Sequence, residues 1–188
     1  NMIRKHIKIE PARWYMHCDR EGILVWQDLP SPNLPSGYED YAKKNFEDES
    51  KRIITAFRNH PSIIQWVVFN EGWGQFDTER MTQIVISEVG QSLVCCASGW
   101  VDAPIGDIKD SHSYPNPSCP LDETRAGVCG EYGGITLKVQ GHIWPGGDFQ
   151  YTTVETGKDF TVLFNNLADK VIDHYYYGLN AAVYTQLS

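Results

Sequence analysis

The chain has 188 residues, and its 41% hydrophobic and 21% charged side chains are typical of a globular protein that buries one sizeable core. Its net charge of −8 and the lack of a basic stripe exclude nucleic acid as an expected partner, because phosphate binding needs clustered positive charge. No apolar run reaches the roughly 18 residues that a membrane span requires, so we expect no membrane partner either. A neutral substrate suits this charge balance better.

Four segments show apolar residues at helical spacing between typical starting and stopping residues. Pro11 suits the first turn of one helix, which stops at Gly22. Ser36 begins a capping box at the start of a second helix, and Asp77 and Thr156 are the expected caps of the other two. The predicted helices span residues 11–21, 36–58, 77–89 and 156–177.

Seven short segments outside these helices predict strands. The run from Ile63 to Phe69 is nearly continuous in apolar residues, which is typical of a strand buried on both faces in a parallel sheet. Because strands and helices alternate, the predicted class is α/β with a parallel sheet. The Gly-rich stretch 133–157 has no clear period, and we interpret it as a long loop. The predicted strands span residues 2–5, 23–28, 63–69, 92–97, 107–114, 126–131 and 181–187.

The sequence lacks the motifs of a nucleotide site, a zinc site or a disulfide framework. No predicted strand-to-helix turn carries a glycine-rich phosphate-binding motif. The five cysteines include no C-x-x-C pair, and their number is odd, so we expect buried thiols and no disulfide. The cysteines are Cys18, Cys95, Cys96, Cys119 and Cys129.

Two predicted strands end in a glutamate that a glycine follows closely. Glu71 follows the run 63–69, and Glu131 ends the small-residue strand 126–131. The carboxyl ends of parallel strands are where an α/β barrel presents catalytic groups, so both side chains would lie on one rim of such a barrel. Two carboxylates facing one cleft are the minimal set for glycoside hydrolysis. One donates a proton to the leaving oxygen, and the other attacks the anomeric carbon or activates water.

Five motifs spread along the chain match those of one known family. They are Asn1-x-Ile-Arg4, Trp14-Tyr-x-x-Cys18-Asp19-x-x-Gly22-Ile-x-Val25, Asn59-His-Pro-Ser-Ile-Ile-x-Trp66, Asn70-Glu71 and Gly130-Glu131-Tyr132-Gly133. On these residues the chain resembles the catalytic barrel of glycoside hydrolase family 2, which contains β-galactosidases, β-glucuronidases and β-mannosidases. The resemblance runs nearly from end to end and implies a (β/α)8 TIM barrel and one catalytic domain over residues 1–188.

The resemblance also implies roles for the residues at the two strand ends. Glu71 would be the general acid/base, and Asn70 would hydrogen-bond the 2-hydroxyl of the sugar. Glu131 would be the nucleophile of a retaining reaction through a covalent glycosyl-enzyme. In such enzymes the two carboxyl groups lie about 5 to 5.5 Å apart.

Other positions match family residues near the substrate. Arg4 would position the nucleophile, and Tyr114 would hydrogen-bond it, with His112 as the competing residue for this contact. Asp28 would contact a sugar hydroxyl, and His6 is similar in position to a residue near the substrate.

Three aromatic positions have less specific assignments. Trp144 either stacks on the sugar or packs within the protein, and Trp73 either lines the cleft or caps the core. His60 is expected to be structural, bonded to the backbone.

Two departures from the family concern metal binding. Some β-galactosidases of the family bind magnesium beside the acid/base through a Glu and a His after the third strand, where this chain has Asp28-Leu-Pro-Ser-Pro. Gly133-Gly134 stands where those enzymes have a His shortly after the nucleophile. We therefore predict no metal and no cofactor.

A further departure concerns the barrel itself. Matching Asn1-x-Ile-Arg4 to the family's second strand leaves no counterpart for its first strand and helix. The expected fold is therefore an incomplete (β/α)8 barrel that lacks the first β/α unit. Its strands at residues 2–5 and 181–187 would have exposed edges, which invite pairing with another chain, so we expect a homo-oligomer through these edges.

The expected function is a retaining β-glycosidase that hydrolyses O-glycosidic bonds of a neutral carbohydrate, with β-galactosidase-like activity favoured. Two alternatives stay open. The first is a truncated barrel, weakly active or inactive, that binds carbohydrate. The second is an endo-acting hydrolase similar to a cellulase or mannanase.

Overall fold

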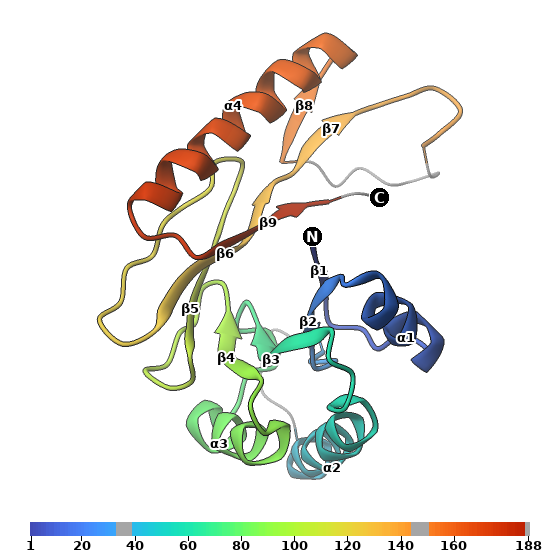
Figure 1. Cartoon of the computed structure of the whole chain (residues 1–188), viewed down its shortest axis with the longest axis vertical. Coiled ribbons are helices and arrows are strands. Elements are labelled where there is room, and N and C mark those ends of the chain that lie inside the picture. The colour runs from blue at the N-terminus through green and yellow to red at the C-terminus, as the bar shows by residue number, and fades with distance from the viewer. Residues whose placement is uncertain (33–38, 144–150, 187–188) are drawn as a thin grey trace. The chain divides into compact units, whose positions relative to one another are not determined.

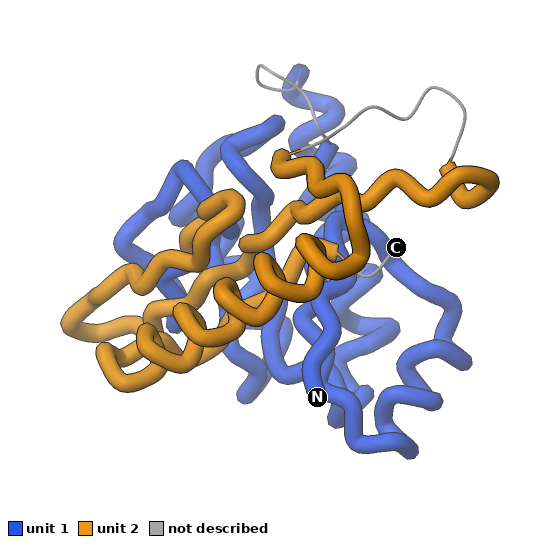
Figure 2. Tube along the Cα trace, turned by 90° about the horizontal axis from the view of Figure 1, so that it is seen from above, with its two compact units in different colours: residues 1–110 blue, residues 111–188 orange. Residues whose placement is uncertain are grey.

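The computed structural model describes residues 1–32, 39–143 and 151–186 (Figure 1). The chain divides into two compact units, which comprise residues 1–110 and residues 111–188 (Figure 2).

Unit 1 (residues 1–110) is built on a four-stranded parallel sheet. Its elements are β1 (Met2–Lys5), α1 (Ala12–Glu21), β2 (Leu24–Asp28), α2 (Asp40–Phe57), β3 (Ile63–Asn70), α3 (Thr78–Val89) and β4 (Leu93–Ser98). The strand order is β1-β2-β3-β4, so each strand lies beside the next one in the chain. The intervening helices are crossover connections, and Figure 1 shows α1, α2 and α3 on one side of this sheet. The predicted α/β class with a parallel sheet is confirmed.

The main core of unit 1 lies between the sheet and these helices. Tyr15 of α1, Ile54 of α2 and Met81 of α3 are fully buried in one cluster with Trp66 and Val68 of β3. Seven of the eight residues of β3 are buried, as its apolar sequence predicts. Burying each large apolar side chain contributes about 1.5–3 kcal/mol, so β3 is held firmly up to the point where its polar end begins.

The helix ends of unit 1 follow the expected start and stop residues with one exception. α1 ends at Gly22, whose left-handed backbone (φ 68°) carries no steric cost in glycine. α3 follows Asp77, but Asp77 is itself left-handed (φ 40°) and makes no side-chain cap hydrogen bond. Its carboxylate lies 3.6 Å from Arg80 instead, so Asp77 stands at the cap position as expected, but its side chain does not cap the helix. Ser36 lies outside the described residues, and α2 begins at Asp40.

Unit 2 (residues 111–188) contains the later strands and one helix. Its elements are the end of β5 (Ile108–Ser113), β6 (Ala126–Gly133), β7 (Ile135–Leu137), β8 (Thr152–Val154), α4 (Gly157–Tyr176) and β9 (Ala181–Thr185). β5, β6 and β9 form a three-stranded sheet in that order, with β6 and β9 parallel. β7 and β8 form a separate parallel pair. The expected loop over 133–157 is therefore wrong in part, because strands of three residues are too short to show a period.

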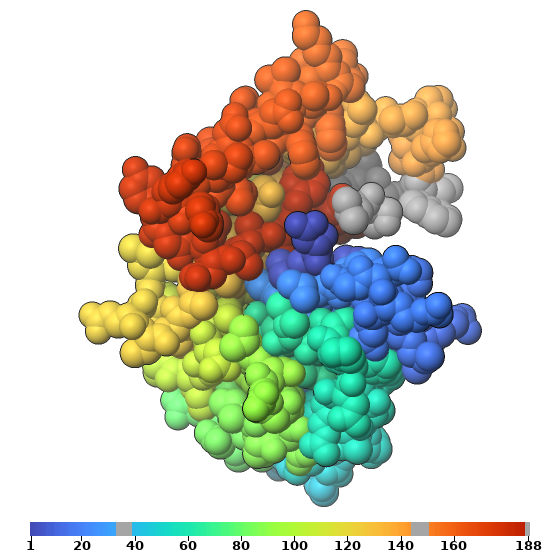
Figure 3. Space-filling model, viewed as in Figure 1, coloured from blue at the N-terminus to red at the C-terminus, as the bar shows by residue number. Residues whose placement is uncertain are grey.

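Helix α4 buries only a narrow stripe. Thr156 caps it as predicted, since its side chain accepts a hydrogen bond from the Asp159 N–H (3.1 Å). Leu167 is buried in the small core of unit 2. Phe164 meets Tyr184 edge-on (5.1 Å between ring centroids) and stays 40% exposed. Much of the surface of α4, drawn orange to red in Figure 3, is therefore open to solvent.

Four of the five cysteine thiols are buried as expected, whereas Cys119 is partly exposed. None of the five cysteines, all of which lie in described segments, forms a disulfide. Cys95 and Cys96 are both fully buried, because both faces of β4 are covered. Within the described ranges, no helix combines the length and the apolar character needed to cross a membrane.

Candidate active site

The turn after β3 presents Glu71 at the carboxyl end of the sheet of unit 1. Glu71 adopts a left-handed backbone (φ 54°), and its N–H donates to the Ser98 carbonyl at the end of β4 (2.8 Å). Gly72 follows with φ 77°, and a Cβ there would lie 2.6 Å from the Val101 side chain. A left-handed non-glycine residue costs on the order of 1 kcal/mol and often marks a functional position. This turn therefore holds a carboxylate in a conformation that packing alone would not favour.

Glu71 opens onto a pocket of unit 1. Trp73, whose N–H donates to the Asn70 carbonyl (3.1 Å), forms one wall and is 36% exposed. His6, from the turn after β1, lies on the lining as well. The described residues that line this pocket are His6, Ile7, Ser31, Pro32, Asn70, Glu71 and Trp73.

Asn70 joins this pocket to a buried ion-pair network. Arg4 donates from Nε to Asp28 Oδ1 (3.1 Å) and from Nη2 to Asp28 Oδ2 and Asn70 Oδ1 (both 2.8 Å). The Arg4 and Asp28 side chains are 3% and 0% exposed. Because a guanidinium only donates, the Asn70 oxygen must face Arg4, and the Asn70 NH2 group is left to donate elsewhere.

Asp28 has a different place from the one expected. Its fully buried carboxylate holds Arg4 through both oxygens, and the Ile7 N–H also donates to Oδ2 (3.2 Å). Ile7 has φ 42°, which is rare for a β-branched residue, and this hydrogen bond helps to hold it. Asp28 thus orients Arg4 and the turn after β1 and does not present its carboxylate to a ligand. The expected contact of Arg4 with the nucleophile stays a prediction.

Glu131 lies on β6 in unit 2, where the pairing with β9 is irregular. Between Cys129 and Tyr132 the register shifts, so Gly130 and Glu131 together face one residue of β9. A bulge of this kind bends the strand and re-aims a side chain, and bulges are frequent beside active sites. The sequence pattern placed Glu131 at a strand end, but it gave no sign of the bulge.

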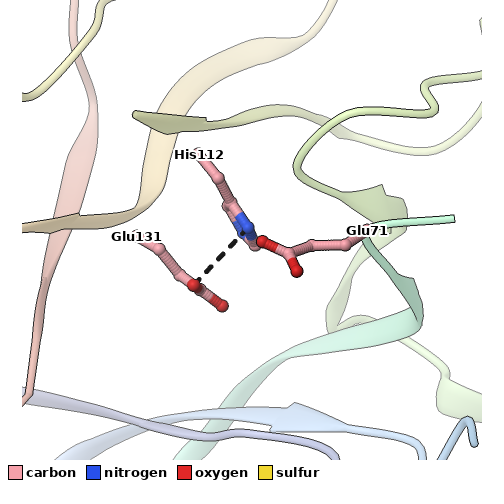
Figure 4. Close-up of side chains that lie close together, drawn as sticks. All are labelled: Glu71, His112 and Glu131. Carbon is pink, nitrogen blue, oxygen red and sulfur yellow. Dashed lines mark ion pairs between the residues drawn. The ribbon is translucent and has the colours of Figure 1, made fainter. Parts of the chain in front are cut away.

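Two side chains of the adjacent β5 segment approach the Glu131 carboxylate. The Tyr114 hydroxyl donates a hydrogen bond to Oε2. His112 Nδ1 lies 3.6 Å from the same oxygen, and Figure 4 shows this pair. The His112 side chain is fully buried, and that of Glu131 is 14% exposed. The sequence left these two residues as competitors, and the structure shows both beside Glu131.

The environment of Tyr114 keeps its phenol protonated. Burial and then the hydrogen bond to Glu131 raise the pKa of Tyr114 well above its ordinary value. The hydroxyl also lies 3.1 Å from Thr185 Oγ1, and the ring stacks on Tyr151 with 3.7 Å between centroids and 4° between planes. Thr185 and Tyr151 were not expected from the sequence, because neither lies in a motif and both are distant from Tyr114 along the chain.

Gly133 and Gly134 fix the backbone around Glu131. The Gly133 N–H donates to the Pro115 carbonyl (3.0 Å), and the Gly134 N–H donates to the Thr185 carbonyl (2.7 Å). A Cβ on Gly134 would lie 2.4 Å from the ring of Tyr151. Only glycine allows this close approach. The pair that was noted as a departure from the magnesium-binding enzymes therefore has a structural role here.

The remaining expected residues fall outside these two clusters. Trp144 lies outside the described residues. His60 is structural as predicted, but it bonds the Asp19 carboxylate (Nδ1 to Oδ2, 2.6 Å) and not the backbone. Among the described residues, no three His, Cys, Asp or Glu side chains of one unit lie within ligand distance of one another, and the expectation of no metal stays a prediction.

Comparison with known proteins confirms the resemblance to glycoside hydrolase family 2. No family model matches the chain. It is 36% identical over 75 residues to a putative β-glucuronidase of Formosa agariphila and 32% identical over 75 residues to β-mannosidase B of Emericella nidulans. These matches cover 38% and 39% of this chain but 7% and 9% of the relatives. A β-galactosidase large subunit of Lactobacillus acidophilus is 27% identical over 124 residues, which cover 55% of this chain and 19% of the relative. The chain thus spans less than a fifth of each relative.

Solved structures share the fold over nearly the whole chain. The β-glucuronidase of Ruminococcus gnavus aligns with 99% of this chain and 37% of its own, at a TM-score of 0.70 and 15% identity. A family 2 β-galacturonidase of Eisenbergiella tayi aligns with 100% of this chain and 37% of its own, at a TM-score of 0.66 and 15% identity. At this identity the likeness shows the fold alone.

Proposed function

We propose that the chain carries the catalytic residues of a retaining β-glycosidase that hydrolyses O-glycosidic bonds. The observation that supports this most strongly is the setting of Glu131. Its carboxylate projects from the bulged part of β6, receives a hydrogen bond from a phenol that stays protonated, and has a buried histidine beside it. The relatives named as β-glucuronidase, β-mannosidase and β-galactosidase support the same reaction class.

The proposed reaction is a double displacement. In the first step, a Glu131 oxygen bonds to the anomeric carbon while Glu71 gives its proton to the leaving oxygen, and the glycosidic bond breaks. In the second step, the Glu71 carboxylate takes a proton from water, and the water oxygen displaces Glu131 from the anomeric carbon. Asn70 would donate from its NH2 group to the sugar 2-hydroxyl, since Arg4 occupies its oxygen.

We infer that the chain is part of a (β/α)8-type barrel. In unit 1, the four parallel strands follow one another in order, with their helices on one side, whereas doubly wound sheets reverse the strand order. β1 and β9 are edge strands of their sheets within the described residues, and we expect these edges to pair with another polypeptide or a second copy. Light scattering measures whether the protein self-associates through these edges, and a monomeric mass would contradict pairing with a second copy.

The proposed substrate is a neutral β-glycoside, with a galactoside favoured. The described lining of the unit 1 pocket includes no lysine or arginine, which a sugar carboxylate would require as a partner. Since two similar proteins are named β-glucuronidase, an aryl β-glucuronide belongs in the test beside the neutral sugars.

The test is a panel of aryl β-galactoside, β-mannoside, β-glucoside and β-glucuronide with the wild type, Glu131→Gln and Glu123→Gln. Glu123 is an exposed glutamate of the same unit and serves as the matched control. We expect the wild type and the control to hydrolyse a neutral glycoside and Glu131→Gln to lose that activity. If the wild type cleaves none of them, or if Glu131→Gln keeps full activity, the proposal is wrong.

A further inference from the structure

We propose that Thr185 is a positioning residue for Glu131 that acts through the hydroxyl of Tyr114. This inference rests on the proposed role of Glu131 as the nucleophile. Thr185 lies at the end of β9, and no sequence motif marks it. Among the described residues its hydroxyl contacts Tyr114, and Tyr114 in turn contacts the Glu131 carboxylate.

The chemistry of the three groups fixes the direction of their hydrogen bonds. A phenol has one proton, and an ionised carboxylate only accepts. The Tyr114 proton therefore goes to Glu131, and the Thr185 hydroxyl, 3.1 Å from the phenol oxygen, donates its own proton to Tyr114. The result is a chain that runs from Thr185 to Tyr114 to Glu131. Hydrogen bonds in such a chain polarise one another, so each strengthens the next.

The backbone holds the two ends of this chain in register. Gly133 pairs with Thr185 across β6 and β9, and the Gly134 N–H donates to the Thr185 carbonyl (2.7 Å). The Gly133 N–H donates to Pro115, the residue after Tyr114 (3.0 Å). The amides of Gly133 and Gly134 therefore hold the backbone on both sides of the chain of hydrogen bonds. One holds Pro115, next to Tyr114, and the other holds Thr185.

Stacking on Tyr151 restricts the movement of the Tyr114 ring. With the ring plane held 3.7 Å from Tyr151, the phenol oxygen is located, and the main freedom left is rotation of the O–H bond. Thr185 restricts this rotation. Its hydroxyl donates to one side of the Tyr114 oxygen, so the Tyr114 proton points toward Glu131. A variant without this donor should present the Tyr114 proton to Glu131 for less of the time.

The experiment compares Thr185→Val, which is nearly isosteric but lacks the hydroxyl, with Thr185→Ser, which keeps it. We expect Thr185→Val to lower kcat/KM for an activated aryl glycoside about 3- to 10-fold, the effect of one hydrogen bond. Thr185→Ser should stay within about twofold of the wild type.

A double-mutant cycle separates this role from simple packing. Tyr114→Phe removes the middle of the chain, so Thr185→Val should have no further effect in the Tyr114→Phe background. Effects that multiply would overturn the inference, as would a Thr185→Val enzyme with wild-type kinetics. Thermal unfolding of each variant checks that it is folded, and Thr185→Ser provides a second test if Thr185→Val is not.

The outcomes also distinguish this inference from the proposed function. An active wild type with unchanged Thr185→Val overturns only the role of Thr185. A wild type that cleaves no glycoside overturns the proposed function and the inference with it.

Discussion

The two candidate catalytic carboxylates are held in opposite ways. Glu71 of unit 1 lies in a left-handed turn beside a pocket, and the residue before it is fixed by a buried charged network of Arg4 and Asp28. Glu131 of unit 2 lies on a bulged strand and is held by a phenol. The hydroxyl and aromatic groups of Tyr114, Thr185 and Tyr151 form its support.

The difference matches what the two proposed roles demand. A nucleophile must keep one orientation and stay ionised, and a donor such as Tyr114 that cannot lose its proton serves both needs. An acid/base must gain and lose a proton during each cycle, and the place of Glu71 on the lining of a pocket gives its carboxyl group access to a substrate or to water. The neighbouring positive charge in unit 1, that of Arg4, instead orients the Asn70 amide, which is proposed to bind the sugar 2-hydroxyl.

The largest effect should follow from Glu131→Gln. Without a nucleophile, kcat/KM should fall about 10⁴-fold or more, and by a similar factor for every leaving group, because no covalent intermediate forms. Initial rates with a series of aryl and alkyl glycosides measure this. The exposed control Glu123→Gln should leave the rates unchanged. A loss that depends strongly on the leaving group would assign Glu131 to the other role.

Glu71→Gln should show the contrasting pattern. Loss of the acid should cost about 10²–10⁴-fold for alkyl leaving groups, which need protonation, and much less for a dinitrophenyl group, which leaves without it. The same series of glycosides measures the dependence, with Glu79→Gln on α3 as the exposed control. Equal losses for all leaving groups would contradict the assignment of Glu71 as acid/base.

Asp28→Asn tests the charged support of unit 1. It removes the carboxylate that accepts two hydrogen bonds from the buried Arg4 guanidinium, so the free energy of unfolding should fall by about 3–5 kcal/mol. Thr185→Val, in the neutral support of unit 2, should cost about 1 kcal/mol. Urea unfolding at pH 7 compares the two, and Asp40→Asn, whose carboxylate is fully exposed, is the control. Equal losses for Asp28→Asn and Thr185→Val would remove the contrast between the two supports.

A weaker charge effect is expected away from the pocket, where Glu47 joins α2 to α3. Hydrogen bonds from Arg80 and Lys51 (both 2.7 Å) lower the pKa of Glu47 to about 2. A lowered carboxyl pKa stabilises the fold above the unfolded value of about 4.3, and this stabilisation is lost as the pH falls toward 2. Because Arg80 is half exposed, Glu47→Gln should cost only about 1 kcal/mol at pH 7.

Urea unfolding at pH 7 and at pH 2 measures this pH dependence. The difference between wild type and Glu47→Gln should shrink at the lower pH, and the exposed Glu49→Gln should show no such dependence. A difference that stays constant with pH would mean that the effect is packing and not charge.

Strong local patterns made much of unit 1 predictable. The apolar run that forms β3 and the end of α1 at Gly22 both depend on residues that are close in sequence. Such local features can be read directly from the sequence. Glu71 and Glu131 could be proposed for the same reason, since each closes a recognisable strand pattern; in the structure Glu71 directly follows β3, and Glu131 lies two residues before the end of β6. Asp77 stands at the expected cap position but makes no side-chain cap hydrogen bond, and its left-handed backbone is a feature that no capping pattern predicts.

Long-range contacts account for most of what the sequence did not show. Asp28 ends a strand, as a ligand-binding residue would, but Arg4 and Ile7 occupy its oxygens. Thr185 meets Tyr114 across 71 residues, and a lone threonine carries no pattern. The short strands β7 and β8 pair across a stretch of low periodicity, so only the folded chain shows them.

Covalent trapping tests the central claim, that Glu131 and not Glu71 is the nucleophile. A 2-deoxy-2-fluoro glycoside with a good leaving group, of the sugar that the wild type cleaves, should leave its fluoroglycosyl group on the enzyme. After trypsin digestion, mass spectrometry should find this added mass on peptide 126–138, which contains Glu131, and Glu131→Gln should remain unlabelled. A label on peptide 59–80, which contains Glu71, or hydrolysis with no label at all, would contradict the account.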